Sequence, residues 1–399
     1  MACGTQHATR GVVTATPVGS DVAALADRVR TARAEGTTLR VVAAGTWLDA
    51  GRPCAAAEHL SVRSLSGIVD YEPGDLTLTA KAATSLEEIA RVTATQGQWL
   101  PLQPMGAAEG TLGATVATAS AGPLASAFGM PRDHVLGCEF VSGTGDVVRA
   151  GGRVVKNVAG FDLVRLMTGA WGTLGVLTEI TVRLRALPEQ DLTFVVPLPT
   201  RGGADSVQVA WSWLRQSDYT PLAAELLSAS LAQGLDVASE PCLLVRLGGN
   251  VSFVRAAEDD VATIGDLRRI DSNIWKRLAV QEPAPSIVMR FSTLPSRISS
   301  LWALASDACE RAGGYAHATI SRGVVRCVLP ASNDAAANSL LGEMLVGLAT
   351  GYTAVGERLP ATAWDALART RSTNPLARGV RRAFDPDHIM NAHILGVTS

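Results

Sequence analysis

Hydrophobic spacing in the first quarter of the chain predicts a mixture of helices and strands. Apolar residues recur at helical spacing over Ser20–Glu35, which indicates an amphipathic helix that begins at Ser20. Ser85 begins a capping-box pattern for a second helix, which we expect to end near Gly97. Strand-like runs occupy Leu39–Val42, Leu60–Val69 and Leu76–Ala80.

Beyond Pro188 strand and helix patterns alternate, which predicts a second α+β domain, a sheet covered on one face by helices. We expect a short helix over Ala377–Ala383, stopped by the Asp385-Pro386 pair. The predicted strands are Leu192–Val196, Leu243–Leu247, Ile287–Phe291 and Val324–Val328. The predicted helices are Ala204–Gln216, Phe253–Ile264, Arg297–Ala312 and Ala335–Ala349.

Composition narrows the class of protein. The 399 residues exceed what one core usually serves, so we expect two domains. A net charge of −2 offers no electrostatic attraction for nucleic acid or an anionic membrane, and neither is expected as a partner. No run reaches the roughly 18 apolar residues of a spanning helix, and the N-terminus lacks a signal-peptide pattern. We therefore expect a cytoplasmic protein without a membrane span.

The cysteines give no sign of a metal or cluster site. The chain has six of them, and no pair has the CxxC spacing that such sites use. We expect reduced, mostly buried cysteines and neither a metal ion nor an iron–sulfur cluster bound by this chain alone.

Small residues in the first half point to a ligand that approaches the backbone. The Arg40–Leu48 run is a strand that ends in a turn, whose successive amides can hold a pyrophosphate, although the run also fits a simple turn. The Pro104–Gly122 segment is rich in glycine and alanine and can form a narrow slot for a flavin and its diphosphate. Its alternative is a helix-packing interface. It lacks the GxGxxG fingerprint of a Rossmann turn.

Two further blocks follow. Arg132–Gly137 precedes a strand and a Gly143–Asp146 turn, and Lys156–Leu163 precedes Gly172–Glu179. In the last segment a Gly-Thr-Leu-Gly turn leads into a β-branched strand, whose main-chain groups can contact the polar edge of a ring.

In this order and spacing the four blocks resemble the FAD-binding domain of the vanillyl-alcohol oxidase/PCMH superfamily. More narrowly, the chain resembles the FAD-binding subunit of bacterial glycolate oxidase, whose KNVAGYDLxRL…G-LGVLTE block it matches nearly residue for residue from Lys156 to Glu179. The resemblance covers roughly residues 15–188 and returns at the tail sequence FDPDHIMN, where Ala392 replaces the family's usual proline.

The resemblance implies an α+β fold: a PCMH-type FAD-binding domain of two subdomains over residues 1–188, and a smaller α+β cap domain with an antiparallel sheet over 189–374. Residues 375–399 are expected to form a tail that packs back on the FAD domain.

The resemblance also implies which residues hold FAD. The first loop replaces two of the family's three glycines with alanine, so its turn must avoid positive φ there or distort. Arg132 and Asp133 are expected to orient the second block rather than to bind FAD. The expected cofactor-binding residues are Ala43, Ala44, Gly45, Thr46, Trp47, Pro104, Met105, Gly106, Thr111, Leu112, Gly113, Ser120, Gly122, Val176 and Leu177.

FAD is expected to be non-covalent. Some members of the superfamily link it through a histidine or cysteine in these loops, but Trp47 and Leu48 stand in the first loop here and Ala127–Gly129 offers neither residue type. Cys54 and His59 lie outside the motif.

The catalytic block of the second domain is mostly missing. Related flavoproteins that oxidise 2-hydroxy acids carry an HxGDGNxH stretch, whereas the corresponding Gly314–Ser321 segment keeps only His317. No metal site is therefore expected. His317 is the candidate catalytic base, with a structural histidine as the alternative, and Lys156 and Arg322 are candidate partners of a substrate carboxylate.

Three functions remain open at this stage. The chain is an FAD-binding subunit of a complex that oxidises glycolate or D-lactate beside a larger FAD-containing subunit and an iron–sulfur subunit. Alternatively, it is a subunit that holds FAD for assembly or electron relay without turnover of its own. The third possibility is a free-standing FAD oxidoreductase for an alcohol or sugar acid. Attachment to the inner membrane through the complex is compatible with the first two.

Overall fold

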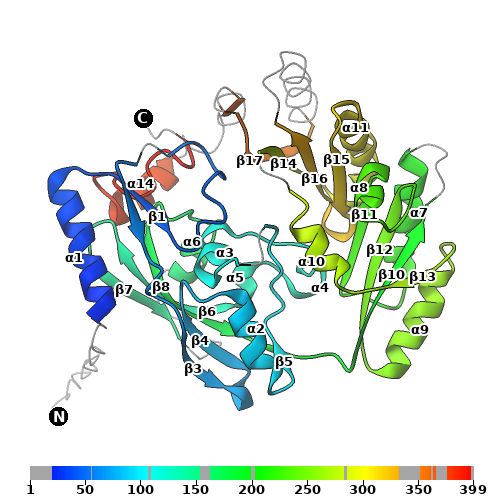
Figure 1. Cartoon of the computed structure of the whole chain (residues 1–399), viewed down its shortest axis with the longest axis horizontal. Helices are drawn as coiled ribbons and strands as arrows, with labels where there is room; N and C mark the ends of the chain where they lie inside the picture. The colour runs from blue at the N-terminus through cyan, green and yellow to red at the C-terminus, as the bar shows by residue number, and fades with distance from the viewer. Residues whose placement is uncertain are drawn as a thin grey trace, which may run out of the picture.

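The computed structural model describes residues 20–54, 56–106, 109–152, 162–198, 203–282, 285–331, 351–360, 363–364 and 375–396. Two halves lie side by side, each with its own sheet, and the chain returns to the first half at its end (Figure 1). The predicted helix Ala335–Ala349 and the motif residues 156–161 lie outside the described residues.

The first half is built on a five-stranded antiparallel sheet. Its core is formed by apolar residues such as Leu78, Phe140 and Ile180, which are almost fully buried. The strand order is β3 (Ile68–Glu72), β4 (Thr77–Lys81), β8 (Gly175–Arg183), β6 (Val135–Ser142) and β7 (Val147–Gly151).

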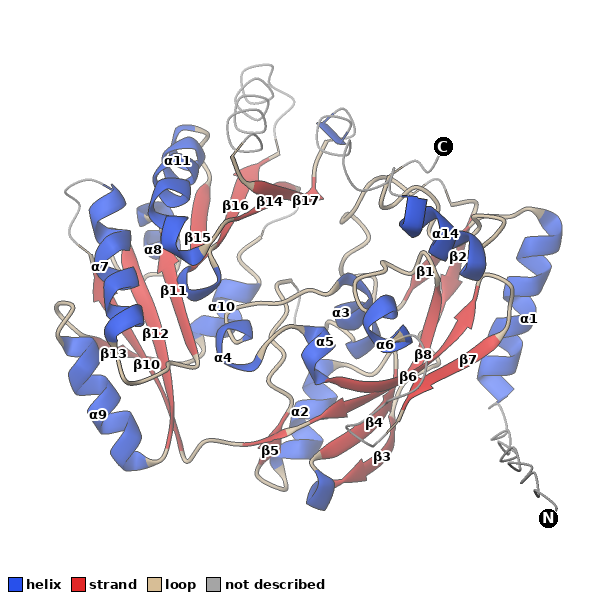
Figure 2. Cartoon of the chain, turned by 180° about the vertical axis from the view of Figure 1, so that it is seen from behind, coloured by secondary structure: helices blue, strands red, loops and turns tan. Residues whose placement is uncertain are grey.

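A smaller unit packs on this sheet. Strands β1 (Leu39–Val42) and β2 (Glu58–Ser61) pair in parallel, and helix α1 (Ser20–Glu35) lies at the outer edge of the molecule (Figure 2). One cluster of buried residues joins the two units, because Leu39 and Leu60 of the small unit pack with Val141 and Val176 of the five-stranded sheet. The first half thus has the two subdomains that the resemblance implied.

Short helices connect the strands of the first half. Helix α2 (Leu86–Ala94) begins as expected at Ser85, whose hydroxyl accepts a hydrogen bond from the Glu88 amide at 3.1 Å. The others are α3 (Leu112–Thr118), α4 (Ala125–Phe128), α5 (Pro131–His134) and α6 (Leu163–Met167), while β5 (Gln98–Trp99) pairs with β9 (Arg185–Ala186).

The second half is an eight-stranded sheet in which all described strand pairs are antiparallel (Figure 1). The order is β13 (Arg268–Ile270), β10 (Gln190–Pro197), β12 (Cys242–Gly249), β11 (Ala223–Leu227), β15 (Tyr315–Thr319), β16 (Val324–Pro330), β14 (Ser286–Ser292) and β17 (Thr353–Arg358).

Helices cover both faces of this sheet at one end, which corrects the prediction of a single covered face. Phe194 and Val196 face one cluster of buried residues, whereas Val195 between them faces another. The first cluster includes residues of α7 (Gly203–Gln216), α9 (Val251–Ala262) and α11 (Ile298–Arg311), and the second those of α8 (Ala229–Gly234) and α10 (Ile274–Ala279). Continuous apolar runs such as that of β10 are typical of strands buried on both faces.

The end of the chain packs on the first half. Helix α14 (Pro375–Phe384) places the Phe384 ring 5.9 Å from that of Phe140. The Leu39 amide donates to the Ile389 carbonyl at 2.7 Å, and the Asn391 amide donates to the Leu39 carbonyl at 2.8 Å. The tail therefore extends the small sheet beside β1. The exact domain limits at 188 and 374 stay a prediction.

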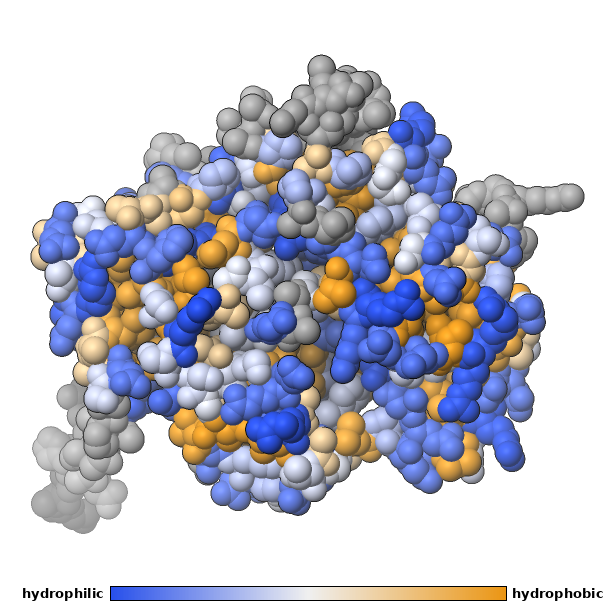
Figure 3. Space-filling view, in the orientation of Figure 1, coloured by the Kyte–Doolittle hydropathy of each residue, from blue (hydrophilic) through white to orange (hydrophobic). Residues whose placement is uncertain are grey.

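One face of the molecule is drawn in Figure 3 with its side chains coloured by hydropathy. On the face seen in Figure 3, apolar side chains form separate groups among polar ones. Within the described residues, no helix is both long and apolar enough to cross a membrane.

Candidate functional site

The loop after β1 presents free amides to a pocket. Arg63 lies outside the loop and donates to the carbonyls of Ala43 and Ala44 at 2.9 and 3.3 Å, which draws these oxygens outward. The amides of residues 44 to 47 donate no hydrogen bond within the described part of the chain. Successive free amides form a nest that binds an anionic group such as a diphosphate.

The loop achieves this shape with one glycine. Gly45 has a φ of +83°, whereas neither Ala43 nor Ala44 has a positive φ. The two alanines are therefore compatible with the turn, and the expectation that they avoid positive φ is met.

The pocket combines residues from distant parts of the sequence. The nest, the start of α3 and the start of β8 form its walls, and Asn391 and Ile394 of the tail close one side. Of the predicted cofactor-binding residues, those that line the pocket are Ala43, Ala44, Gly45, Thr46, Trp47, Thr111, Gly113, Val176 and Leu177.

The other predicted residues do not line this pocket. Leu112 and Met105 are buried, and a Cβ on Gly122 would collide with the Gln103 carbonyl oxygen. Pro104 and Ser120 are half-buried outside the pocket lining. Their direct contact with FAD remains a prediction.

Close packing of small residues shapes the wall formed by α3. A Cβ on Gly113 would lie 2.7 Å from both Cβ and the carbonyl oxygen of Ala82, so a larger residue would push α3 away from the sheet. Thr111 caps this helix by accepting from the Ala114 amide at 3.3 Å.

Asn391 holds two walls of the pocket together, a role that sequence reasoning missed. Its side-chain Oδ1 accepts from the Val41 amide at 2.8 Å, and its Nδ2 donates to the Trp171 carbonyl at 2.7 Å. A Cβ on Gly172 would lie only 2.6 Å from the same Nδ2. The FDPDHIMN block that ends at Asn391 was the signal available in the sequence.

Trp47 connects the pocket to the second half. Its ring centroid lies 6.2 Å from that of Trp171, and the Arg358 guanidinium lies 5.8 Å from its centroid. A Cβ on Gly106 would collide with the Trp47 indole nitrogen, so this predicted glycine makes room for the indole. Arg63, Trp171 and Arg358 are further residues of the site that the sequence did not identify.

The residues present fit a non-covalently held FAD. The nest supplies free amides for the diphosphate, and Met167, Trp171 and Val176 supply apolar surface for the rings. Neither a histidine nor a cysteine is among the described residues that line the pocket. Burial raises the pKa of the Cys54 thiol, which favours its unreactive protonated form.

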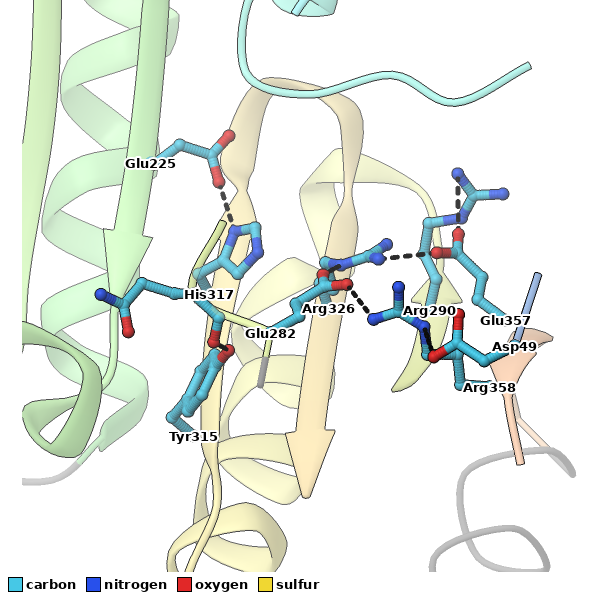
Figure 4. A network of polar contacts seen from close by, with 10 residues as sticks. Asp49, Glu225, Glu282, Arg290, Tyr315, His317, Arg326, Glu357 and Arg358 are labelled. Atoms are coloured by element: carbon cyan, nitrogen blue, oxygen red, sulfur yellow. Dashed lines mark hydrogen bonds and ion pairs between the residues drawn. The ribbon is translucent and has the colours of Figure 1, made fainter. Parts of the chain in front are cut away.

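One face of the sheet of the second half carries a row of polar side chains (Figure 4), and Arg358 of this row pairs with Asp49 of the first half. His317 on β15 is opposite Arg326 on β16, and Arg326 is opposite Arg290 on β14. Two residues that follow β15 contact helix α4 of the first half. The Ser321 hydroxyl donates to the Ser126 hydroxyl at 2.9 Å, and the Arg322 guanidinium donates to the Ala125 carbonyl at 3.1 Å.

Most of the arginines in this row form ion pairs with carboxylates of the protein. Arg326 forms ion pairs with Glu282 and, at 2.7 Å, with Glu357. Arg358 pairs with Glu282 at 3.1 Å and Asp49 at 2.9 Å. The predicted carboxylate partner Arg322 is half-buried, and burial, followed by the charge of Arg290, lowers its pKa. The other candidate, Lys156, lies outside the described residues.

Opposite charges determine the protonation of this network. Burial alone would raise the pKa of the Glu357 carboxyl, but Arg326 and Arg290 outweigh it and the pKa is lowered. Burial likewise opposes the charge of Arg326, but Glu357 and Glu282 raise its pKa. Both groups are therefore ionised at neutral pH.

His317, the predicted base, is buried on this row. Its Nδ1 lies 2.9 Å from Oε2 of Glu225, a fully buried carboxylate on β11. Helix α4 of the first half contacts β11, so His317 is bonded to a strand that lies against the first half. Among the described residues, no group of three or more histidine, cysteine or acidic side chains could hold a metal ion.

Comparison with known proteins defines the class. Residues 15–151 match the family model described as an FAD binding domain. The structure resembles p-cresol methylhydroxylase with substrate bound, at a TM-score of 0.72 and 16% identity over 94% of this chain and 87% of that one. It also resembles alkyldihydroxyacetonephosphate synthase, at a TM-score of 0.67 and 16% identity over 92% of this chain and 75% of that one. The fold is therefore the PCMH-type FAD-binding fold, and the cofactor is FAD.

Sequence similarity identifies the family within this class. Glycolate oxidase subunit GlcE of Escherichia coli is 33% identical over 288 residues, which cover 71% of this chain and 74% of that protein. The chain belongs to this family of FAD-linked oxidoreductase subunits. D-lactate dehydrogenase [cytochrome] of Arabidopsis thaliana mitochondria is 35% identical over 40% of this chain, but only 28% of that protein is covered. Glycolate oxidase subunit GlcD of Bacillus subtilis is 33% identical over 38% of this chain and 32% of that protein.

Proposed function

We propose that this chain is the FAD-binding subunit of a complex that oxidises glycolate or D-lactate to the 2-oxo acid. In this proposal a larger FAD-containing subunit and an iron–sulfur subunit complete the complex, and electrons pass to the latter. The complex works in the cytoplasm, with any contact to the inner membrane made through its partners. The observation that carries the proposal is the nest of free amides at residues 44–47 in a chain of the glycolate oxidase subunit family.

Each part of the site has a defined task in this function. The nest, whose carbonyls Arg63 binds from outside, holds the diphosphate, and Trp47, Trp171 and Val176 enclose the rings. Bound FAD supplies the acceptor for two electrons and a hydrogen from the substrate carbon. In this proposal His317 accepts the hydroxyl proton, because it is the histidine among the buried polar side chains drawn in Figure 4 and its Nε2 has no partner among the described residues.

A second function is favoured by a different observation. The cations Arg326 and Arg358 are already paired with Glu282, which leaves them little capacity for a substrate carboxylate. A buried cation that is neutralised within the protein binds an anion weakly. The chain would then hold FAD for assembly or electron relay, while substrate turnover takes place on the larger subunit.

Co-expression tests both functions. The chain is purified alone and with candidate large and iron–sulfur subunits, and flavin absorbance is followed during anaerobic addition of glycolate or D-lactate. We expect the isolated chain to bind FAD and to reduce it slowly or not at all, and the complex to reduce it rapidly. Rapid bleaching in the isolated chain would contradict the relay function, and a chain without FAD would contradict both.

A further inference from the structure

The Glu225–His317 pair differs from the other buried carboxylates of the structure. Glu282 and Glu357 pair with arginines, and Asp385 accepts from the Ile389 and Met390 amides. Glu225 is fully buried, and the partner of its Oε2 is the Nδ1 of His317, itself only 5% exposed.

Each member of the pair keeps one polar atom without a partner. Glu225 Oε1 and His317 Nε2 are both buried and make no hydrogen bond. Leaving two such atoms unsatisfied is costly for a folded protein, and it is tolerated where a ligand or solvent group completes the bonding. The pair is therefore built to receive a further polar group.

The geometry determines which tautomer of His317 the pair favours. A carboxylate only accepts hydrogen bonds, so a neutral imidazole beside it donates from Nδ1 and leaves a lone pair on Nε2. Nε2 is then the proton acceptor.

The pair also lies where the two halves meet. Helix α4 of the first half packs against β11, which carries Glu225. This helix follows directly on the Ser120–Gly122 loop, and a segment of the first half passes above Glu225 in Figure 4.

We propose that Glu225 is a positioning residue that holds His317 so that its Nε2 takes the hydroxyl proton of a 2-hydroxy acid. The inference rests on the proposed oxidation of such an acid by FAD. The O–H bond breaks and its proton moves to Nε2, the carbon–oxygen double bond forms, and the hydrogen on that carbon leaves with two electrons for the oxidised flavin. Glu225 stabilises the resulting imidazolium charge.

The test separates the charge of Glu225 from its shape. Glu225→Gln removes the charge, Glu225→Asp keeps it, and Asp260→Asn is the matched control. Asp260 accepts from Trp213 and Ser217 on the opposite, helix-covered side of the same half. All variants are made in the full chain with FAD and in the complex.

Two measurements are made on each variant. The first is the ¹⁵N shift of the His317 ring nitrogens, assigned by comparison with His317→Gln, which reports the tautomer whether or not substrate turns over. The second is the rate of flavin reduction by glycolate and D-lactate in the complex. We expect Glu225→Gln to change the tautomer population and to slow flavin reduction by about 10²-fold, the lower end of a general base's contribution. Glu225→Asp should recover part of this rate, and Asp260→Asn should change neither quantity.

A double variant tests whether Glu225 acts through His317. On the His317→Gln background, Glu225→Gln should slow flavin reduction no further, because the group it positions is gone. Unchanged ring shifts in Glu225→Gln would overturn the positioning role, as would additive losses in the double variant. If no hydroxy acid reduces the flavin of the wild-type complex, the proposed reaction and the proton transfer both fail, and the ring shifts still decide whether Glu225 sets the tautomer.

Discussion

Gly45 provides the only positive φ among residues 43 to 47 of the nest. A Cβ there would have open space, with Leu48 Cδ1 as its nearest neighbour at 3.7 Å, so backbone conformation rather than a clash restricts the position. The neighbouring alanines stand where the resembling family has glycine, and the backbone makes this possible because both avoid the left-handed region.

Replacing Gly45 by alanine should therefore weaken FAD binding. Holding alanine in the left-handed region costs about 1–2 kcal/mol, which corresponds to roughly a fivefold to thirtyfold loss in affinity if only the bound loop adopts it. The dissociation constant of FAD, measured by flavin fluorescence, checks this. Ala44→Gly is the control, and an equal loss in it would show that the φ of Gly45 is not the cause.

Arg63 acts on the nest from outside. Its guanidinium binds two loop carbonyls and adds a positive charge near the free amides. We expect Arg63→Gln to weaken FAD binding by about 0.5–1.5 kcal/mol, because these exposed hydrogen bonds have a modest net strength. Equilibrium titration with FAD measures the change. Arg311→Gln, which removes an exposed arginine paired with Asp307 on α11, should leave FAD affinity unaltered.

At the scale of elements, the tail depends on Asn391. The amide joins β1 to the segment before β8 through two hydrogen bonds, and its φ of +41° suits asparagine better than most residues. Asn391→Ala should lower the free energy of unfolding by about 1–3 kcal/mol, because two half-buried backbone groups lose their hydrogen bonds. It should also lower FAD content.

Thermal unfolding of apo- and FAD-loaded protein measures both effects of Asn391→Ala. Asn250→Ala is the matched control, because Asn250 caps α9 in the second half by accepting from the Phe253 amide at 2.8 Å. We expect it to cost about 1 kcal/mol and to leave FAD content at the wild-type level. Equal FAD loss in both variants would argue against a specific role of Asn391.

Most elements could be predicted from local patterns. The α1 bounds agree with the predicted Ser20–Glu35, and α2 begins after the predicted Ser85 cap. The predicted run Leu60–Val69 was wrong as a single strand, because β2 ends at Ser61 and β3 begins at Ile68. Alternation within one run cannot show a turn that joins two different sheets, since pairing partners lie elsewhere in the chain.

At the scale of the whole molecule, polar contacts link the two halves around the pocket. Arg358 of β17 pairs with Asp49 beside the nest, and the Gly106 amide donates to the Ala279 carbonyl at 2.8 Å. Gln103 Nε2 also donates to the Trp275 carbonyl at 2.9 Å. The nest is therefore tied to the ion network that contains Arg326 and its carboxylates.

This network should make the fold sensitive to acid. The pKa of Glu357 is lowered in the folded chain, so its contribution to stability is present above the unfolded value of 4.5 and is lost as the pH falls through the folded value. Burial raises the pKa of Asp385, which acts in the opposite sense: its contribution is present at low pH and is lost as the pH rises through its folded value.

Glu357→Gln should reduce the acid sensitivity and lower stability at neutral pH. The loss at neutral pH is expected to be about 3–5 kcal/mol, because arginines are left without their carboxylate. The midpoint temperature of unfolding is recorded from pH 3 to pH 7. As the pH falls below 4.5, the usual pKa of a glutamate, this temperature should decrease less steeply in Glu357→Gln than in the wild type. Asp307→Asn, which breaks an exposed pair with Arg311, serves as the control. A slope like that of wild type in Glu357→Gln would contradict the assignment.

The sequence by itself determined the α+β class, the FAD loops and the positions of most helices and strands. These properties follow from local spacing, from glycine where the backbone needs it, and from short blocks whose order is preserved along the chain. Ala43 to Trp47, Thr111, Gly113, Val176 and Leu177 could be placed at the pocket for this reason.

Only the tertiary structure decided which distant residues complete the site. Asn391 reaches the pocket because the tail adds to β1, and Glu225 reaches His317 because β11 pairs with β15. The Arg358 guanidinium lies over the Trp47 ring because β17 of the second half packs beside the nest. Such contacts join residues far apart in sequence, and no local spacing encodes them. The same limit applies to the arginines, whose neutralisation by Glu282 and Glu357 became visible only once their strands were paired.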